Sequence, residues 1–340
     1  MNLKDLSDYL GLSQTTVSRA LNGYPEVSEK TRKRVQDAAA AHNYRPNTRA
    51  KGLATGRTMS IGHVIPISAR HEIVNPIFAD FIAGAGEIYS KNGYDMHLTV
   101  VPDTDEARVY RDIASKGSVD GVIVHGPLQN DPRIKLLQDL GLPFAVHGRS
   151  GRGDEDYNWV DVNNARAFER ATNFLIDLGH RRIALLNGNE KMDFAARRRL
   201  GYLTAHGARG LTHDPALMFS DEMTEHYGYA SVLRALDHPS PPTAFLISSI
   251  ISSIGARRAL EERGLQLGRD ISIITHDDEL SYLKNGEDLP IFTATRSSVR
   301  EAGRICAQMV LDVIANPTSP PQHRLLESDL TVGNSTGPAP

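Results

Sequence analysis

Cysteine is almost absent from this sequence: Cys306 is the single one among 340 residues. A lone thiol excludes an internal disulfide framework, and it cannot by itself hold a metal ion. Cys306 falls within the helical pattern Val299–Ile314, where the expected role is that of a small buried hydrophobic side chain. We therefore expect neither a metal site nor a cofactor.

Long apolar runs are also missing. No segment approaches the roughly 18 uninterrupted apolar residues of a membrane-spanning helix. The chain opens with Met1–Leu6, which lacks the basic region and apolar stretch of an export signal. These two absences predict a cytoplasmic protein that does not contact a membrane.

The common catalytic motifs are absent as well. The sequence has no Gly-rich phosphate loop, no His/Cys spacing typical of a metal site and no Gly-x-Ser-x-Gly turn. The adjacent carboxylates Asp277 and Asp278 suggest acid–base chemistry, but neighbouring positions on a strand point to opposite faces and cannot flank one bond. We therefore predict that the protein is not an enzyme.

Charge is distributed unevenly along the chain. The whole chain carries a formal charge of −3, yet residues 1–57 contain ten Lys or Arg and five Asp or Glu, a net charge of +5. The remainder then carries −3 minus +5, or −8. A basic head on an acidic body indicates a polyanionic partner for the head, although a basic surface is often only a solvated face.

Three short helices are predicted in the head. Leucines repeat at helical spacing over residues 3–10, and a glycine follows them. Ser13 and Ser28 are good N-caps for a second helix over 14–21 and a third over 29–43. The sequence therefore predicts a small helical domain before residue 46.

Two short helices joined by a Gly-containing turn form a helix-turn-helix, whose second helix lies in the DNA major groove. Gln14, Thr15 and Arg19 fall on the outward side of that helix, where they can pair with adenine, a thymine methyl and guanine. The candidate DNA contacts in this segment are Ser13, Gln14, Thr15, Thr16, Ser18, Arg19 and Asn22. The helical pattern alone leaves open a plain three-helix scaffold whose exposed Gln and Arg only contact water.

Three segments of the head have a distinctive order and spacing: Thr16-Val17-Ser18-Arg19-Ala20-Leu21-Asn22, Val27-Ser28-Glu29-Lys30-Thr31-Arg32 and Asn43-Tyr44-Arg45-Pro46-Asn47. Together they resemble the LacI/GalR family of bacterial repressors. The resemblance implies a helix-turn-helix DNA-binding domain over 1–45 and a hinge helix over 46–57. It also implies a homodimer on a pseudo-palindromic double-stranded operator, and hence association with the nucleoid.

The resemblance assigns the hinge a specific role. Pairs of these helices fold only on operator DNA and enter its minor groove, and Leu53 matches the leucine that wedges between base steps; Asn47 is a further expected contact. So short an isolated helix is marginal in water, and Gly52 weakens it by about 1 kcal/mol relative to alanine. An apolar wedge of this kind bends DNA at the cost of unstacking two bases.

After residue 58 the pattern changes to β-branched runs that alternate with amphipathic helices. This alternation predicts an α/β core with parallel sheets wound on both sides by helices. About 280 residues are too many for one such sheet, and Trp159-Val160-Asp161 falls where a second would begin. We expect a core over 58–340, with lobe one at about 58–157 and 290–318 and lobe two at about 158–289 and 319–340.

Family landmarks recur along this core. They are Asn75-Pro76-Ile77-Phe78, Leu178-Gly179-His180-Arg181-Arg182-Ile183-Ala184, Asp270-Ile271-Ser272-Ile273 with Asp277-Asp278, and Ser335-Thr336 in a closing strand expected over 331–335. The resemblance therefore spans nearly the whole chain. It implies a two-lobed core similar to periplasmic sugar-binding proteins, with the helix 299–314 returning to the first lobe.

Ligands in such folds bind in the crevice at the carboxyl ends of the strands. By the resemblance, Arg198 and Asp277 correspond to the effector-binding arginine and acid of the family, and Met223 replaces an aromatic that stacks on the ligand. The candidate effector contacts are Arg198, Asp277, Arg149, Met223, Ser249, Asn75 and Phe78. Because three arginines are consecutive at 197–199, a salt-bridged helix surface is the alternative role of Arg198.

Two features depart from the family pattern. Ser248-Ser249-Ile250 stands where the family has Asn-Asp, so one polar side chain is shorter and a carboxylate is missing. The trailing tetramerisation helix is also missing, which favours a dimer. The segment Leu12–Pro25 resembles repressors of proteobacterial α-glucoside uptake operons, which implies an α-glucoside effector, although the residues alone support only a small polyhydroxylated ligand.

We therefore predict a dimeric transcriptional repressor whose operator affinity is controlled by a sugar between the lobes. Ligand would shift the population toward a lobe arrangement that separates the hinge helices. A co-repressor, which would act with the opposite sign, is the open alternative. A transport-type sugar-binding protein is the rival from another class, but it would need an export signal and no basic head.

Overall fold

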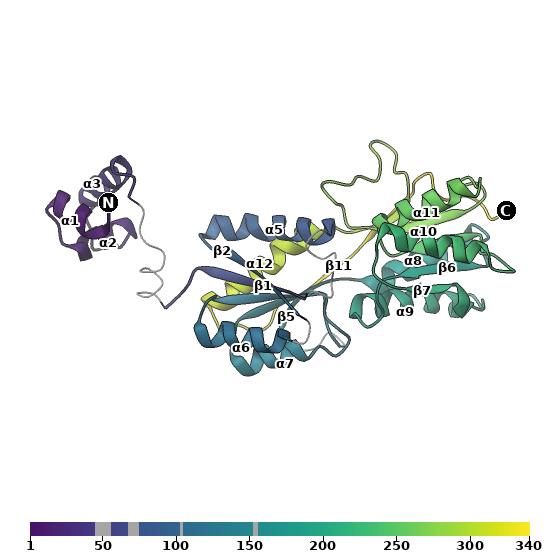
Figure 1. Ribbon diagram of the computed structural model, residues 1–340, viewed down its shortest axis with the longest axis horizontal. Coiled ribbons are helices and arrows are strands. Elements are labelled where there is room, and N and C mark those ends of the chain that lie inside the picture. Colours follow the sequence, from purple (N-terminus) through teal and green to yellow (C-terminus); the bar gives the residue numbers. More distant parts are fainter. Residues whose placement is uncertain (45–55, 67–74, 103–104, 152–155) are drawn as a thin grey trace. The chain divides into compact units, whose positions relative to one another are not determined.

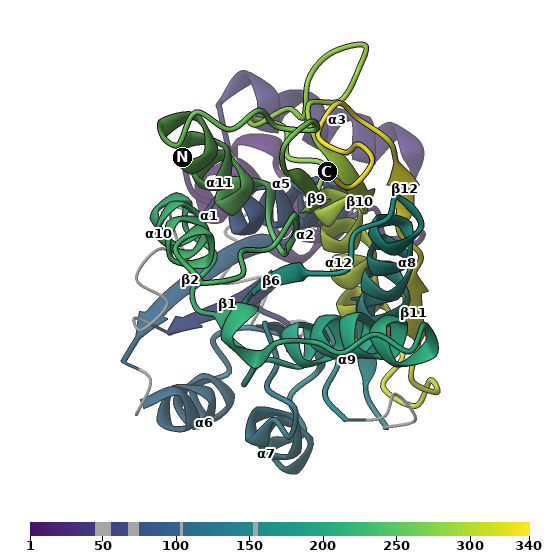
Figure 2. The same cartoon turned by 90° about the vertical axis from the view of Figure 1, so that its right-hand side faces the viewer.

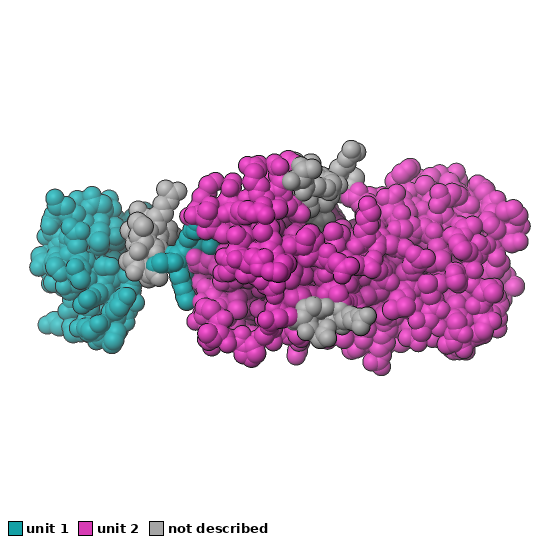
Figure 3. Space-filling view, turned by 90° about the horizontal axis from the view of Figure 1, so that it is seen from below, with its two compact units in different colours: residues 1–59, 117–119 teal, residues 60–116, 120–340 magenta. Residues whose placement is uncertain are grey.

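The computed structural model describes residues 1–44, 56–66, 75–102, 105–151 and 156–340. This part of the chain divides into two compact units, residues 1–59 with 117–119 and residues 60–116 with 120–340 (Figure 3). We call residues 1–44 the head and residues 60–340 the core. The predicted hinge contacts Asn47 and Leu53 lie outside the described residues.

The head consists of three helices, α1 (Leu3–Leu10), α2 (Gln14–Leu21) and α3 (Glu29–Ala41) (Figure 1). Asn2, Ser13 and Ser28 cap them, because each side chain accepts a hydrogen bond from a backbone N–H of the first turn. α3 ends two residues before the predicted boundary, since Asn43 has φ of 47°, in the left-handed region. The buried apolar core of the head comprises Leu6, Leu10, Val17, Ala20, Val27, Val35 and Ala39.

The first sheet of the core has the strand order β11-β5-β4-β3-β1-β2, and all neighbouring strands run parallel. Its strands are β1 (Ser60–Pro66), β2 (Asp95–Val101), β3 (Gly121–His125), β4 (Phe144–His147), β5 (Asn158–Val162) and β11 (His323–Leu326). The register pairs His125 with His147, so the carboxyl ends of β3 and β4 lie side by side.

Helices cover both faces of this sheet. α5 (Pro76–Asn92) and α12 (Val299–Ala315) lie side by side on one face, and α6 (Glu106–Lys116) and α7 (Pro132–Leu140) lie on the other (Figure 1). The central strands are therefore buried almost throughout, as is typical of parallel sheets. We call this layer structure lobe one.

The second sheet has the order β12-β10-β9-β8-β6-β7, and only the pair β10–β12 is antiparallel. Its strands are β6 (Ile183–Asn187), β7 (Met218–Ser220), β8 (Ala244–Ile247), β9 (Ser272–Asp277), β10 (Thr293–Arg296) and β12 (Asp329–Thr331). The strands β7, β10 and β11 were not predicted; β7 follows a 3-10 turn at Pro215–Leu217. With its helices this sheet forms lobe two.

Different helix pairs cover the two faces of the second sheet (Figure 2), and alternate residues of its strands belong to different apolar clusters. Leu185 and Leu246 belong to the cluster with α8 (Asn164–Asp177) and α9 (Asp193–Ala208). Leu186 and Phe245 belong to the cluster with α10 (Glu225–Leu236) and α11 (Ile250–Glu262). The sheet is thus wound on both sides, as the sequence pattern predicted.

The predicted border between the lobes is wrong for three strands. β11, within the segment 319–340 that was expected in lobe two, pairs with β5 in the first sheet. β5, which carries Trp159, pairs with β4 and β11 and completes the first sheet instead of beginning the second. β10, expected in lobe one, pairs with β9 and β12 in the second sheet. The closing strand also lies earlier than predicted, at Asp329–Thr331, while Ser335 accepts a hydrogen bond from the Ile273 N–H at 2.8 Å.

The chain crosses between the sheets three times. The crossings run from β5 to α8, from β10 to α12 and from β11 to β12. Each connection takes no more than a few residues, and the second returns the chain to lobe one, as predicted for the helix at 299–314. Each lobe is therefore assembled from separate stretches of the chain.

Candidate functional site

Helix α2 presents the predicted DNA contacts at the surface of the head. Gln14, Thr15 and Arg19 are exposed, and their side chains form no hydrogen bond within the described residues. Val17 is fully buried, on the opposite side of the helix. The helix therefore offers three polar side chains to a partner while its apolar side stays fixed in the head.

The remaining predicted contacts in the head stabilise the helix ends. Ser13 Oγ accepts the Thr16 N–H at 3.1 Å and lies 2.8 Å from Thr16 Oγ1. Asn22 Nδ2 donates to the Ser18 carbonyl at 2.8 Å. These four residues begin and end α2, so they set the position of the exposed side chains between them.

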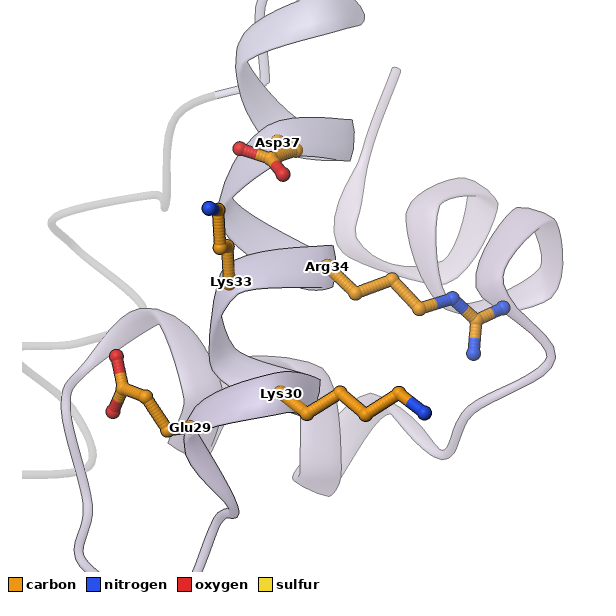
Figure 4. A pocket seen from close by; sticks show the side chains of 5 residues that line it. All are labelled: Glu29, Lys30, Lys33, Arg34 and Asp37. Carbon is orange, nitrogen blue, oxygen red and sulfur yellow. The ribbon is translucent and has the colours of Figure 1, made fainter.

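A hollow on the head lies along α3 and is lined by Glu29, Lys30, Lys33, Arg34 and Asp37 (Figure 4). Lys30 and Arg34 extend to one side of the helix, and Glu29 lies on the other (Figure 4). Arg34 Nη2 donates to the Leu10 carbonyl at 2.8 Å, which ties α3 to the end of α1. The hollow carries charges of both signs and is separate from the exposed side of α2.

In the core, Arg198 is buried although it lies among three consecutive arginines of α9. Its Nε donates to Asn164 Oδ1 and its Nη1 to the Ser248 carbonyl, both at 2.7 Å. The guanidinium lies over the rings of Phe168 and Phe194, with 5.1 and 5.0 Å to the ring centroids. Burial lowers the pKa of Arg198 to about 10.

The two neighbouring arginines do not share this environment. Arg197 pairs with Asp193, one turn earlier on the same helix. Arg199 Nη1 lies 2.8 Å from Glu190 Oε2, and 48% of its side chain is exposed. Only Arg198 therefore combines burial with a charge that no carboxylate within salt-bridge distance compensates in the described residues.

Asp277, the last residue of β9, and Asp278 make different contacts, which the sequence did not predict. Asp277 Oδ1 accepts the Glu279 N–H at 2.9 Å, and its Oδ2 lies 3.6 Å from Arg296 Nε. Asp278 instead has an oxygen 3.5 Å from His276 Nε2, and it interacts electrostatically with Arg198. Of this pair, Asp278 rather than the predicted Asp277 is thus the carboxylate that acts electrostatically on the buried arginine.

The pKa of Asp278 reflects its burial and the basic side chains around it. Burial acts to raise it, but His276, Arg198 and His147 together hold it below its usual range. His147 lies at the carboxyl end of β4 in lobe one, whereas the other two groups belong to lobe two. Asp278 therefore interacts with ionisable groups of both lobes.

Arg149 also forms an ion pair, with a partner that the sequence analysis did not single out. Its Nε donates to Asp161 Oδ2 at 2.8 Å, and its guanidinium lies 5.3 Å from the centroid of the Trp159 ring. Burial raises the pKa of Asp161 to about 6, although Arg149 and Arg197 oppose the increase. The strand carrying Asp161 was recognised, but it was placed in the wrong sheet, so the pairing with Arg149 was missed.

Aromatic and histidine rings from lobe one form the other side of this region. Phe78, near the start of α5, packs edge-on against His125 at 5.1 Å, and Phe81 stacks on His147 at 4.3 Å. Both histidines stay partly accessible at the ends of β3 and β4. Neither histidine was predicted as a site residue, because each is an isolated residue within its own strand.

Three further predicted residues have local roles in the structure. Asn75 Oδ1 accepts the Ile77 N–H at 3.0 Å and caps α5, while the fully buried Ser249 caps α11. Met223 is half-buried, and its sulfur lies 3.3 Å from the position that a Cβ at Gly188 would occupy. The same position lies 2.9 Å from the Phe194 ring, so Met223 borders the surroundings of Arg198.

Loops of the two lobes contact each other beside these residues. The Asp193 N–H donates to the Pro127 carbonyl at 3.0 Å, and Leu128 forms an isolated antiparallel bridge with Met192. On another side, the Ser281 N–H donates to Asp80 Oδ2 at 2.7 Å. Polar groups of both lobes are therefore held close around Arg198 and Asp278.

Other kinds of site find no support in the described part of the chain. No group of three or more His, Cys, Asp or Glu residues there could hold a metal ion, and Cys306 is buried. No helix found there has the length and apolar character that crossing a bilayer requires.

Two family profiles match the chain. Residues 2–47 match the family described as bacterial regulatory proteins, lacI family, and residues 172–336 match the periplasmic binding protein-like domain. The first match covers the head, and the second covers most of lobe two together with α12.

Individual proteins are similar over almost the full length. The chain is 47% identical to the HTH-type transcriptional regulator AglR of Rhizobium meliloti (strain 1021), with 100% of this chain and 95% of AglR aligned. The solved CelR–cellobiose complex has a TM-score of 0.73 at 28% identity over 98% of this chain and 99% of that one. The lac repressor dimer bound to operator and the anti-inducer ONPF has a TM-score of 0.83 over 99% of both chains; at 23% identity, this similarity concerns the fold.

Proposed function

Because the chain belongs to the lacI family of bacterial regulatory proteins, we propose that it is a transcriptional repressor controlled by a small neutral sugar. Its relatives are transcriptional regulators rather than enzymes, and the family resemblance predicted from the sequence is confirmed. The protein would act in the cytoplasm, at the nucleoid, as a homodimer on a pseudo-palindromic operator.

The DNA-binding part of the proposal rests on α2. Its exposed Gln14, Thr15 and Arg19 would contact base edges in the major groove, because these groups match the donor and acceptor patterns found there. The hinge residues Asn47 and Leu53 would add minor-groove contacts.

The effector part rests on one observation: the buried guanidinium of Arg198 forms no salt bridge within the described residues, although Asp278 acts on it electrostatically. A planar donor and a nearby carboxylate can bind adjacent hydroxyl groups of a sugar, which both donate and accept hydrogen bonds. The proposed contact set is Arg198, Arg149, Asp278, Met223 and Phe78. Asp277, Ser249 and Asn75 are left out of it, because the described contacts already use their side-chain oxygens.

Charge balance favours a neutral ligand. The other arginines around the site have carboxylate partners, as shown by Arg149 with Asp161 and Arg296 with Asp277 and Glu279. A phosphate or carboxylate ligand would lie beside Asp278 without a second free cation to compensate it. An α-glucoside fits this requirement, and the cellobiose in the CelR complex shows that a similar chain accommodates a glucose disaccharide.

A thermal-shift screen tests the effector directly. Maltose, sucrose, trehalose and cellobiose would be compared with glucose 6-phosphate and glucuronate, because a ligand that binds only the folded state raises the unfolding midpoint. Each stabilising compound would then be added to an operator-binding assay. We expect a neutral α-glucoside to stabilise the protein and to weaken operator binding.

Other outcomes have clear meanings. Stronger operator binding in the presence of the sugar would identify a co-repressor and reverse the proposed sign. Stabilisation by the charged sugars alone would contradict the charge argument. If no compound shifted the midpoint, the DNA-binding function would stand and the sugar-effector proposal would be withdrawn.

A further inference from the structure

A chain of three hydrogen-bonded side chains, two of them buried, runs through lobe one and ends beside the proposed sugar site. Tyr89 of α5 has its hydroxyl 3.2 Å from His63 Nε2, and His63 Nδ1 lies 2.9 Å from His125 Nε2. Tyr89 and His63 are 1% and 0% exposed, whereas His125, at the end of β3, stays partly accessible. The chain therefore connects the interior of the lobe to its carboxyl edge.

The direction of the hydrogen bonds follows from the chemistry of Tyr89. Its hydroxyl has one hydrogen and no partner other than His63 in the described residues, apart from the thiol of Cys306 nearby. If this hydroxyl accepted from His63, its own hydrogen would be buried without an oxygen or nitrogen acceptor, which is costly. Tyr89 therefore donates to His63 Nε2.

The ring nitrogen that carries the proton in His63 and in His125 then follows. A neutral imidazole carries one N–H, so His63 with an accepting Nε2 has its hydrogen on Nδ1 and donates it to His125 Nε2. His125 must accept at Nε2 and therefore carries its hydrogen on Nδ1. That Nδ1–H has no protein acceptor within the described residues.

Burial keeps both rings neutral and so preserves this order. It lowers the pKa of His63 to about 3, and it lowers the pKa of His125 well below its usual range. The groups facing His125 act in the same direction: His63 from β1, His147 from β4 and Arg133 from α7. Phe78 and Phe81 of α5 complete its surroundings and carry no charge.

We propose that His63 is a positioning residue that fixes His125 in one tautomer, so that the Nδ1–H of His125 donates to an oxygen of the effector. The inference rests on the proposed function, since it assigns a contact within the same sugar site. His125 lies 6.1 Å, centroid to centroid, from His147, which in turn faces Asp278. The ligand must therefore place an acceptor, such as a hydroxyl, ring or glycosidic oxygen, against lobe one and its donors against Asp278.

Two substitutions at one position separate this role from a packing role. His63→Leu removes both hydrogen bonds, and the freed His125 can adopt the other tautomer, which presents an acceptor to the ligand. His63→Gln retains a carbonyl for Tyr89 and an N–H for His125, and it should keep the order. His206→Leu is the matched control, because His206 is also buried (1% exposed) but lies in α9, and its one hydrogen bond within the described residues is to the Tyr202 carbonyl.

The measurement is calorimetric affinity for the sugar found in the screen, between pH 8 and pH 6, on the full-length protein. Wild type and His63→Gln should bind with an affinity that does not change over this range. His63→Leu should bind about three- to tenfold more weakly at pH 8, the equivalent of one net hydrogen bond. The weakening should be the same at pH 6, because burial keeps His125 neutral over this range, and it should be absent in His63→Gln, which restores the hydrogen bond to His125.

The outcomes distinguish this inference from the proposed function. If wild type binds no sugar, the proposed function fails first. If wild type binds and His63→Leu binds equally well, or if His63→Gln binds as weakly as His63→Leu, His63 has no positioning role. A loss of affinity in His206→Leu similar to that in His63→Leu would assign the effect to stability alone, and circular dichroism of each variant verifies folding.

Discussion

At the scale of single residues, Arg198 is the side chain on which the proposed site depends. It is 5% exposed, and its hydrogen bonds to Asn164 and Ser248 come from the start of α8 and the end of β8. The guanidinium has five N–H donors, so donors remain for a ligand after these two bonds. A change at this residue should therefore affect ligand binding first.

Arg198→Ala should bind the operator normally and lose its response to the sugar. Hydrogen bonds from a charged donor contribute about 1.5–3 kcal/mol, so sugar affinity should fall about 10- to 100-fold. Calorimetry measures the sugar affinity, and fluorescence anisotropy with labelled operator measures DNA binding. The control is Arg199→Ala, whose exposed pair with Glu190 contributes little; an unchanged response in Arg198→Ala would move the site elsewhere.

Arg19→Ala should lose the preference for the operator over unrelated DNA. A bidentate contact between arginine and guanine contributes about 1–3 kcal/mol of discrimination, and Arg19 is the exposed arginine of α2. Competition binding at one fixed salt concentration measures the ratio of specific to non-specific affinity. Sugar affinity should stay unchanged, and equal operator preference in the variant would refute the role of α2. Arg257→Ala, an exposed helix pair in the core, is the control.

At the scale of elements, α5 and α12 pack unusually close through glycine. A Cβ at Gly84 would lie 2.0 Å from the Arg300 carbonyl oxygen, and one at Gly303 would lie 2.2 Å from the Phe81 carbonyl oxygen. Real contacts of this kind do not occur, so any side chain at these positions would force the helices apart. Lobe one therefore depends on two residues that have no side chain.

Gly84→Ala should destabilise the core by about 1–3 kcal/mol or more, because the added methyl group meets backbone that cannot move alone. Gly86→Ala on the same helix is the matched control, since its nearest contact is the Met96 methyl at 3.9 Å. Alanine favours a helix over glycine by about 1 kcal/mol, so this control should be neutral or slightly stabilising. Urea unfolding monitored by circular dichroism compares the two; equal stabilities would disprove the close packing.

The same scale explains what the sequence could predict and what it could not. Helix starts at Ser13 and Ser28 were predicted correctly, because an N-cap is a local hydrogen bond that the sequence shows directly. The sheet to which β5 and β10 belong was not, since strand pairing depends on residues far apart in the chain. The identification of Asp278, Asp161 and His125 failed for the same reason: their partners lie on other strands and helices.

At the scale of the whole molecule, buried histidines should make the core sensitive to acid. Burial lowers the pKa of His63 to about 3 and that of His147 to about 4, whereas unfolded histidine titrates near 6.5. Below about pH 6.5, these histidines bind protons in the unfolded chain but not in the folded chain. The stability that the core has above this pH is therefore lost as the pH falls. Asp161, with its pKa raised to about 6, acts in the opposite direction and offsets one histidine.

The free energy of unfolding of the core should therefore fall by about 1–3 kcal/mol per pH unit between pH 6 and pH 4.5, as each unmatched proton contributes about 1.4 kcal/mol. Urea unfolding at several pH values measures the slope. His63→Gln should reduce this slope by about 1.4 kcal/mol per pH unit, the contribution of roughly one proton. A core that is as stable at pH 5 as at pH 7 would contradict the assignment of these histidines as buried and neutral.

The three crossings between the sheets have a consequence for how this protein can be engineered. Because β11 and α12 return to lobe one after lobe two has been built, no single cut in the gene separates the lobes. A chimera that transplants one lobe from a relative must exchange two distant coding segments together, with junctions inside the same three crossings. A change of effector preference by recombination is thus harder than an exchange of the head, which needs only one junction between the head and the core. New pairings of operator and effector should therefore arise mainly by exchange of heads.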